Sequence, residues 1–184
     1  MDKNKIILVT GGARSGKSTF AENLLKHSDD VLYIATSIIT DEEMEDRVKK
    51  HRSRRNSNWN TYEGYFDLDN VLEKYSNKYI LLDCVTIMTT NLMFSLGNNL
   101  EEVSMEEIDK IIVKIKREFD KLIKKARETN KTLVMVTNEV GLGVVPAYKV
   151  GRIFRDVAGF VNQYIGNLSD EVYLICCGQS LKIK

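Results

Sequence analysis

Cysteine, histidine and proline are scarce in this sequence, which has three, two and one of them in 184 residues. The cysteines, Cys84 and the adjacent Cys176 and Cys177, form no C-x-x-C pair, so a zinc site is not expected. An odd number of thiols in a reducing compartment, which the cytoplasm expected below provides, also argues against disulfides. Because all three lie in apolar, strand-like stretches, we expect them to be buried and to behave as small hydrophobic side chains.

An excess of charge of either sign is also lacking, since 27 basic residues face 26 acidic ones for a net charge of +1. No overall field therefore attracts nucleic acid or a membrane surface, and neither partner is expected. No apolar run approaches the roughly 18 residues of a membrane span. Only residues 1–5 precede Ile6, the first residue of the apolar sequence Ile-Ile-Leu-Val, which leaves no room for a signal peptide, and we expect a cytoplasmic protein.

Five short apolar runs are present instead, and their near-continuous hydrophobicity is typical of parallel strands buried on both faces. They cover residues 5–10, 31–35, 79–83, 132–137 and 171–176. Helix-like stretches alternate with them at 17–26, 41–55, 67–75, 86–96, from 104 onward, and 146–165. The pattern predicts one α/β domain over residues 1–184, with a mainly parallel sheet and helices on both faces. Two helix starts are marked by a Ser104-x-x-Glu107 capping box and by Pro146.

The motif G-x-x-x-x-G-K-[ST] lies between the first predicted strand and the first predicted helix, the context that a phosphate-binding loop requires. It consists of Gly11, Gly12, Ala13, Arg14, Ser15, Gly16, Lys17 and Ser18. Glycines let backbone N–H groups approach a polyphosphate, Lys17 can reach the outer phosphates, and the Ser18 hydroxyl can bind Mg²⁺. The motif predicts a P-loop NTPase-type (RecA-like) fold; the alternative is a glycine-rich turn without a ligand.

Ligands of open α/β sheets bind beyond the carboxyl ends of the strands, where this sequence places several polar residues. Asp83 ends an apolar strand. Phosphate-loop enzymes place at such a strand end the acid that holds Mg²⁺ or its waters. That Asp83 instead caps the next helix is an equally supported alternative. Asn138 and Glu139 follow another strand. They could polarise a substrate hydroxyl or position a metal-bound water, although a polar turn is slightly favoured.

A basic run, residues 49–55, surrounds one of the two histidines. Met44, Val48 and His51 fall on one helical face, which by periodicity alone favours a half-buried structural histidine. A solvated helix end and a nucleic-acid patch are further alternatives. A reactive His51 could attack the α-phosphorus of a nucleoside triphosphate, with neighbouring arginines neutralising the pyrophosphate that leaves. The other histidine, His27, ends the first helix and is expected to be structural.

These residues together resemble the bifunctional adenosylcobinamide kinase/adenosylcobinamide-phosphate guanylyltransferase family of cobalamin synthesis, over nearly the whole chain. The resemblance rests on residues 10–18, Tyr-Ile-Ala-Thr-Ser at 33–37, Asp-Glu-Glu-Met at 41–44, His-Arg-x-x-Arg at 51–55 with Trp59, Leu-Leu-Asp-Cys at 81–84, Asn-Leu at 91–92, Thr-Asn-Glu-Val-Gly at 137–141, and residues 154–163. The phosphate loop alone indicates only a superfamily. The histidine run and the Thr-Asn-Glu-Val-Gly segment are much more specific.

The resemblance implies a two-step enzyme. ATP or GTP phosphorylates the hydroxyl of the aminopropanol arm of adenosylcobinamide, and GTP then transfers GMP through His51 to adenosylcobinamide-phosphate. Lys17, Asp83 and His51 are the implied catalytic residues, and Ser18 and Asp83 the implied Mg²⁺ ligands. The implied nucleotide contacts, besides the phosphate loop, are Ala35, Thr36, Ser37, Arg52, Ser53, Arg54, Arg55, Glu63 and Asp83. The family also implies a homotrimer.

Two other functions are compatible with the same predicted fold. A RecA-like ATPase acting on nucleic acid could use the basic run, but the balanced charge and the shortness of that run oppose it. A nucleotide-binding regulator without catalysis is the second alternative, and the candidate nucleophile beside the basic cluster opposes it.

Overall fold

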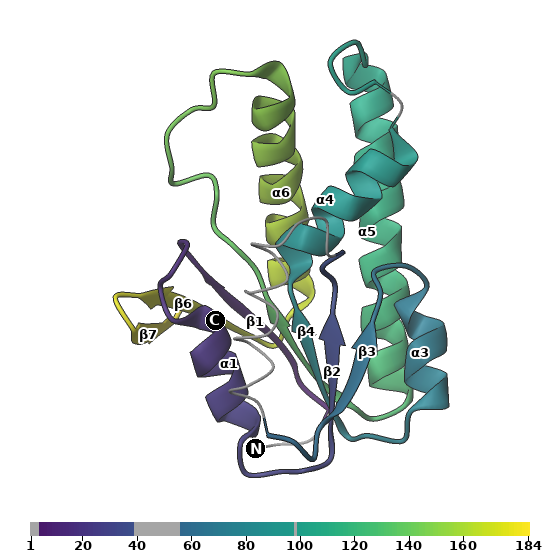
Figure 1. Ribbon diagram of the computed structural model, residues 1–184, viewed down its shortest axis with the longest axis vertical. Coiled ribbons are helices and arrows are strands. Elements are labelled where there is room, and N and C mark those ends of the chain that lie inside the picture. The colour runs from purple at the N-terminus through teal and green to yellow at the C-terminus, as the bar shows by residue number, and fades with distance from the viewer. Residues whose placement is uncertain (1–3, 39–55, 98) are drawn as a thin grey trace.

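A seven-stranded sheet forms the centre of the part of the chain that the computed structural model describes, residues 4–38, 56–97 and 99–184 (Figure 1). Its strands are β1 (Ile6–Gly11), β2 (Val31–Ala35), β3 (Asn60–Glu63), β4 (Tyr79–Asp83), β5 (Thr132–Val136), β6 (Glu171–Cys176) and β7 (Gln179–Lys182). The order across the sheet is β3-β2-β4-β5-β1-β6-β7. All neighbouring pairs are parallel except β6 and β7.

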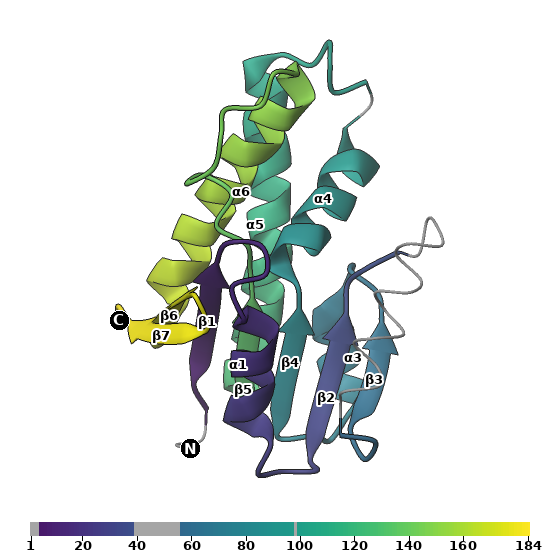
Figure 2. The same ribbon diagram turned by 60° about the vertical axis from the view of Figure 1, so that its left-hand side comes forward.

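The five helices within the described residues cover both faces of this sheet. They are α1 (Lys17–Leu25), α3 (Leu68–Lys74), α4 (Val85–Leu96), α5 (Met105–Glu128) and α6 (Lys149–Leu168). Figure 2 shows α1 in front of the strands and α5 and α6 behind them. Alternate residues of β1 pack on opposite faces of the sheet. Ile7 and Val9 belong to the hydrophobic core cluster that includes α1, and Ile6 and Leu8 belong to the cluster that includes the other helices. The predicted mainly parallel α/β arrangement is confirmed.

The capping box predicted at the start of α5 is confirmed. The Ser104 hydroxyl accepts a hydrogen bond from the N–H of Glu107 at 3.3 Å, and the Glu107 carboxylate accepts one from the N–H of Ser104 at 2.9 Å. Both bonds satisfy donors that the first turn of a helix leaves without intrahelical partners. From there α5 places one apolar stripe against the core.

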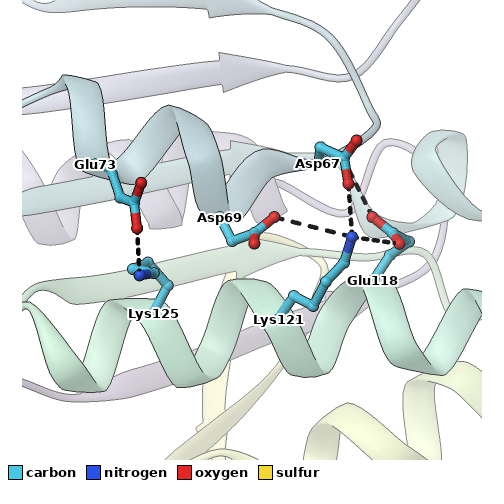
Figure 3. Close-up of polar contacts among 6 residues, drawn as sticks. All are labelled: Asp67, Asp69, Glu73, Glu118, Lys121 and Lys125. Carbon is cyan, nitrogen blue, oxygen red and sulfur yellow. Dashed lines mark hydrogen bonds and ion pairs between the residues drawn. The ribbon is translucent and has the colours of Figure 1, made fainter.

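A cluster of charged side chains fastens α3 to α5 (Figure 3). The Nζ atom of Lys121 lies 2.6 Å from the Asp67 carboxylate and 2.7 Å from that of Glu118, and Lys125 pairs with Glu73. Asp69 lies 4.0 Å from the same Nζ atom of Lys121. Because several carboxylates share two ammonium groups, this contact stabilises the packing of α3 on α5.

Several predicted elements differ from the observed ones. The strands β3 and β7 were not predicted, because each has four residues, mostly exposed, and lacks an apolar run. The prediction that Pro146 lies in the first turn of the last helix is wrong, since α6 begins at Lys149. The guanidinium of Arg152 instead donates to the carbonyl oxygens of Pro146 and Ala147, which holds these residues in the preceding loop. The helix predicted over residues 41–55 lies outside the described residues.

Candidate functional site

The phosphate-loop motif forms a tight turn between β1 and α1. Gly11 has a φ of +155°, and a Cβ atom there would lie 2.3 Å from the carbonyl oxygen of Ile175. Gly16, the residue that caps α1, has a φ of +99°. Residues with side chains rarely adopt either conformation, so the two glycines are required for the backbone to close into this turn. The turn leads directly into the amino-terminal end of α1, where unpaired backbone N–H groups and the helix dipole favour an anion.

Lys17 begins α1 and folds back over the loop. Its side chain is buried, with 8% of the residue exposed, and its ammonium group donates a hydrogen bond to the carbonyl oxygen of Gly12 at 2.7 Å. Burial lowers the pKa of Lys17, although the nearby Cys84 and Asp83 act in the opposite direction. Among the described residues, no carboxylate lies within 4.0 Å of this ammonium group as an ion pair. A buried cation of this kind favours an anionic ligand.

Ser15 supplies a second sign that the loop is built for a ligand. Its Oγ atom is buried and has no hydrogen-bond partner among the described residues. The backbone of Ser15 is fixed from outside, because its carbonyl oxygen accepts a 2.9 Å hydrogen bond from the N–H of Gly178 in the β6–β7 turn. Buried hydroxyls are nearly always hydrogen-bonded, so an unpaired one in a phosphate loop indicates a place for an acceptor.

Asp83 lies at the end of β4, close enough to Lys17 for the two charges to interact. Its carboxylate accepts a 2.7 Å hydrogen bond from the hydroxyl of Tyr33. The alternative that Asp83 caps the next helix is wrong: Cys84 is the N-cap of α4, and its sulfur accepts from the N–H of Ile87. The carboxylate therefore remains available beside the phosphate loop.

The cysteines divide into two kinds. Cys84 is buried as expected, and burial, with the charge of Asp83, raises its pKa to about 12, so its thiol stays protonated. The expectation of burial is wrong for Cys176 and Cys177, which are exposed. They lie where β6 turns into β7, and Cys177 adopts a left-handed φ of +52° that carries the chain out of the sheet.

The ends of three neighbouring strands bring further predicted residues to the same edge. Ala35 pairs with Glu63 on one side and with Asp83 on the other, so the three lie at one level of the sheet. Thr36 is fully buried, and its hydroxyl donates to the carbonyl oxygen of Cys84 and accepts from the N–H of Cys84. That hydroxyl thus fastens the end of β2 to the end of β4. Ser37, the next residue, is partly buried.

A buried polar network, not predicted from the sequence, fixes the end of β5. The hydroxyl of Thr137 donates to the Asn162 side chain on α6 at 2.6 Å and lies 3.2 Å from the hydroxyl of Thr86 on α4. The Asn162 amide donates to the carbonyl oxygen of Asn138, and the N–H of Asn138 donates to Thr86. These contacts join residues far apart in the chain. In the sequence, the polar residues that follow β5 were the only indication of such a network. Two helices therefore hold the turn that carries Asn138.

Glu139 connects this turn to the phosphate loop. Its N–H donates a 3.0 Å hydrogen bond to the carbonyl oxygen of Gly11, and one of its carboxylate oxygens accepts from the N–H of Gly141 at 3.2 Å. The acid therefore stands beside the first residue of the loop, on a backbone anchored to α4 and α6. The bond from Gly141 is that of a polar turn, the alternative slightly favoured from the sequence.

Seven predicted residues lie outside the described residues: Met44, Val48, His51, Arg52, Ser53, Arg54 and Arg55. The other histidine, His27, follows α1 and makes an edge-to-face contact with the ring of Tyr79 at 5.6 Å. That contact agrees with its predicted structural role. No helix of the described residues combines the length and apolar character needed to cross a membrane.

A phosphate loop between a buried parallel strand and a helix, with an acid at the end of a nearby strand, defines the chain as a P-loop nucleotide-binding protein. Comparison with known families assigns it further. Residues 7–183 match the cobinamide kinase / cobinamide phosphate guanyltransferase family, and the chain belongs to that family. The sequence resemblance is thereby confirmed, and both activities are those of the family.

Relatives described as bifunctional adenosylcobalamin biosynthesis proteins align with almost the whole chain. The bifunctional adenosylcobalamin biosynthesis protein CobU of Escherichia coli strain K12 is 43% identical over 183 residues, which are 97% of this chain and 99% of the relative. CobU of Salmonella typhimurium strain LT2 shows the same identity and coverage. The corresponding CobP of Pseudomonas aeruginosa strain PAO1 is 34% identical over 180 residues, 96% of each chain. These matches decide against the nucleic-acid ATPase and the non-catalytic regulator.

Proposed function

We propose that a single phosphate loop holds the nucleoside triphosphate in both reactions of this enzyme, phosphorylation of adenosylcobinamide and transfer of GMP to adenosylcobinamide-phosphate. The observation that carries this proposal is that two buried polar groups of the loop lack partners among the described residues. The ammonium group of Lys17 has no ion pair, and the hydroxyl of Ser15 has no hydrogen bond. The triphosphate supplies the anionic partner that Lys17 lacks and the hydrogen-bond acceptor that Ser15 lacks.

Ser18 and Asp83 are the proposed protein ligands of a Mg²⁺ ion that accompanies the triphosphate. A hydroxyl and a carboxylate are the hard oxygen donors that Mg²⁺ prefers, and Mg²⁺ typically takes only one or two protein ligands besides water and phosphate oxygens. Among the described residues, no group of three or more acidic, histidine or cysteine side chains is arranged so that it could hold a metal ion. When bound, the ion neutralises charge on the phosphates.

In the kinase step, ATP or GTP lies in the loop and the oxygen of the acceptor hydroxyl forms a bond to the γ-phosphorus. The bond to the β–γ bridging oxygen breaks, the nucleoside diphosphate leaves, and the hydroxyl proton passes to water. Lys17 lies over the loop where negative charge on the γ-phosphate and the leaving diphosphate increases. Because the group is preorganised in a largely buried position, it stabilises this charge without reorganisation of solvent. The hydrogen bond from Tyr33 keeps the Asp83 carboxylate in place beside it.

In the transferase step, an imidazole nitrogen of His51 forms a bond to the α-phosphorus of GTP, the bond to the bridging oxygen breaks, and pyrophosphate leaves. A phosphate oxygen of adenosylcobinamide-phosphate then attacks the same phosphorus and releases His51, which gives adenosylcobinamide-GDP. The proposed nucleotide contacts around this step are Ala35, Thr36, Ser37, Arg52, Ser53, Arg54, Arg55, Glu63 and Asp83. Ala35, Glu63 and Asp83 support the proposal by lying at one level of the sheet edge.

The finer architecture follows the same reasoning. We assign the RecA-like subtype because β5 lies between the phosphate-loop strand β1 and the acid-bearing strand β4. We treat residues 1–184 as one domain, since a single sheet unites β1 at the beginning of the chain with β7 at its end. A homotrimer is proposed from the family resemblance.

Incubation with GTP labelled on the α-phosphate tests the proposal. The wild-type protein and the His27→Ala control are expected to acquire an acid-labile, base-stable label, and His51→Ala is expected to acquire none. Since His27 is the chain's other histidine, comparing His51→Ala with His27→Ala shows whether labelling requires His51 itself or is lost when either histidine is removed. Labelling of His51→Ala at the wild-type level would contradict the role of His51.

A further inference from the structure

Two cavities adjoin one another along α6. The larger, about 530 Å³, lies between α5 and α6, and the smaller, about 370 Å³, lies between α6 and the strands β1 and β6. Gly159 and Gln163 line both cavities, so the two meet at this part of α6, and together they are called the groove. In both views of the chain, α5 and α6 run side by side (Figures 1 and 2).

The larger cavity has an apolar floor and a polar rim. Its apolar lining comes from both helices: Met105, Ile108, Ile112, Ile153, Val157 and Phe160. Asp109, Arg155, Asp156 and Gln163 supply polar groups around it. Met105 and Phe160 are 73% and 51% exposed. A ligand with a broad apolar face and hydrogen-bonding edges matches such a surface.

The smaller cavity reaches the phosphate loop. Glu139 lines it, and the N–H of Glu139 donates to the carbonyl oxygen of Gly11. Thr10, the residue before the loop, lines it as well, is only 8% exposed, and has an Oγ atom without a hydrogen-bond partner. A buried hydroxyl that lines a cavity without a partner indicates a polar ligand group at that place. This end of the groove therefore presents a hydroxyl and a carboxylate beside the triphosphate site.

We propose that this groove binds the cobinamide acceptor, with the corrin macrocycle on the apolar lining between α5 and α6 and the aminopropanol arm extending to Thr10 and Glu139. The macrocycle has broad apolar faces and amide groups along its edges, which correspond to the floor and to the polar rim. The arm ends in the hydroxyl that receives the phosphate, and Glu139 accepts a hydrogen bond from it. The inference rests on the proposed function, since it places the acceptor of the same kinase step.

Gly159 is the position that tests the groove. A Cβ atom there meets no atom within 4 Å, so a side chain projects into open space rather than into the core. Gly159→Trp is expected to fill the groove where the two cavities join, and Gly159→Ala to leave it passable. Val113→Trp is the matched control, because Val113 is 65% exposed on α5 and lines neither cavity.

The measurement is the dissociation constant of the full-length protein for cobinamide, taken beside covalent labelling by GTP in the absence of cobinamide. Gly159→Trp is expected to raise the dissociation constant about tenfold or more and Gly159→Ala to raise it less, while Val113→Trp stays within about twofold of wild type. Labelling by GTP is expected to persist in all three. Because labelling tests the nucleotide chemistry and cobinamide binding tests the groove, failure of one is distinguishable from failure of the other.

Unchanged cobinamide affinity in Gly159→Trp would overturn the proposal. If the groove is covered by a second copy of the chain, Gly159→Trp changes the sedimentation coefficient and leaves cobinamide affinity unaltered, which overturns it as well. Phe160→Ser provides a second variant should Gly159→Trp fail to fold. It removes apolar lining without adding bulk and is expected to weaken cobinamide binding in the same direction.

Discussion

Two lysines of this protein show how a ligand site differs from a structural contact. Lys17 is buried in the phosphate loop and donates to a backbone carbonyl, whereas Lys121 lies among the carboxylates of Asp67, Asp69 and Glu118 (Figure 3). Burial lowers the pKa of Lys17. Burial also acts against the charge of Lys121, yet its hydrogen bonds to Asp67 and Glu118 prevail and raise its pKa. The chain supplies anions to Lys121, and we infer that the nucleotide supplies them to Lys17.

The largest expected effect is on catalysis at the first of these lysines. Lys17→Met is expected to lower the turnover of cobinamide phosphorylation about 10²- to 10³-fold, because it removes a preorganised charge from the leaving phosphates. Its melting temperature is expected not to fall, since a buried ammonium group without an ion pair costs folding free energy. Steady-state kinetics and calorimetry on the same preparation check both statements. A large drop in melting temperature would show that Lys17 is a structural residue.

The second largest effect is on stability at Lys121, where stability and not turnover is expected to change. Lys121→Met is expected to lower the free energy of unfolding by about 1–2 kcal/mol, because it leaves three carboxylates without their shared cation. The loss is smaller than for a fully buried pair because solvent reaches Lys121. Urea unfolding measures the change, and kinase turnover is expected to stay near the wild-type value. A stable but inactive Lys121→Met would contradict the comparison.

The dependence of this contribution on pH follows from the direction of the shift. Since the pKa of Lys121 is raised in the folded state, its stabilisation is fully present below the unfolded value near 10.4 and is lost as pH rises through the folded value. The stability difference between wild type and Lys121→Met is therefore expected to be constant between about pH 7 and 9 and to shrink above about pH 10.5. Unfolding curves across that interval measure it. A difference that grew with pH would have the wrong sign.

The smallest expected effect on stability is at Ser15. Ser15→Ala removes a buried hydroxyl without a hydrogen bond, so the free energy of unfolding is expected to change by less than about 0.5 kcal/mol or to rise slightly. Nucleotide affinity is expected to fall about three- to tenfold, because the triphosphate loses a donor. Equilibrium titration with GTP and urea unfolding separate the two quantities. Unchanged affinity would show that the hydroxyl has no ligand.

The parts of the fold that follow from local pattern were predictable from the sequence. The bounds of β2, β4 and β6 are those that the apolar runs predict, and the glycines at 11 and 16 occupy the conformations that the motif requires. The capping box at Ser104 is equally local. Each of these depends on residues within a few positions of one another, where hydrophobic period and backbone sterics decide the outcome.

The parts that depend on distant contacts were not predictable. The network of Thr86, Thr137 and Asn162 joins two helices to a strand end, and nothing local marks Thr86 as a member of it. Pro146 has the right sequence position for a helix start, but Arg152 holds its carbonyl oxygen in the loop. Exposure of Cys176 and Cys177 follows from the turn of a hairpin whose second strand has no apolar run. The role of His51 stays a prediction, and the family match supports it.

The central claim is that one phosphate loop serves both reactions, and single-turnover guanylylation in Lys17→Met tests it most directly. Protein is mixed with GTP labelled on the α-phosphate in the absence of cobinamide, and the rate of covalent labelling is compared among wild type, Lys17→Met and Lys121→Met. The account predicts a strong loss of labelling rate in Lys17→Met and none in Lys121→Met. Labelling of Lys17→Met at the wild-type rate, with its kinase turnover lost, would place the GTP that His51 attacks outside this loop.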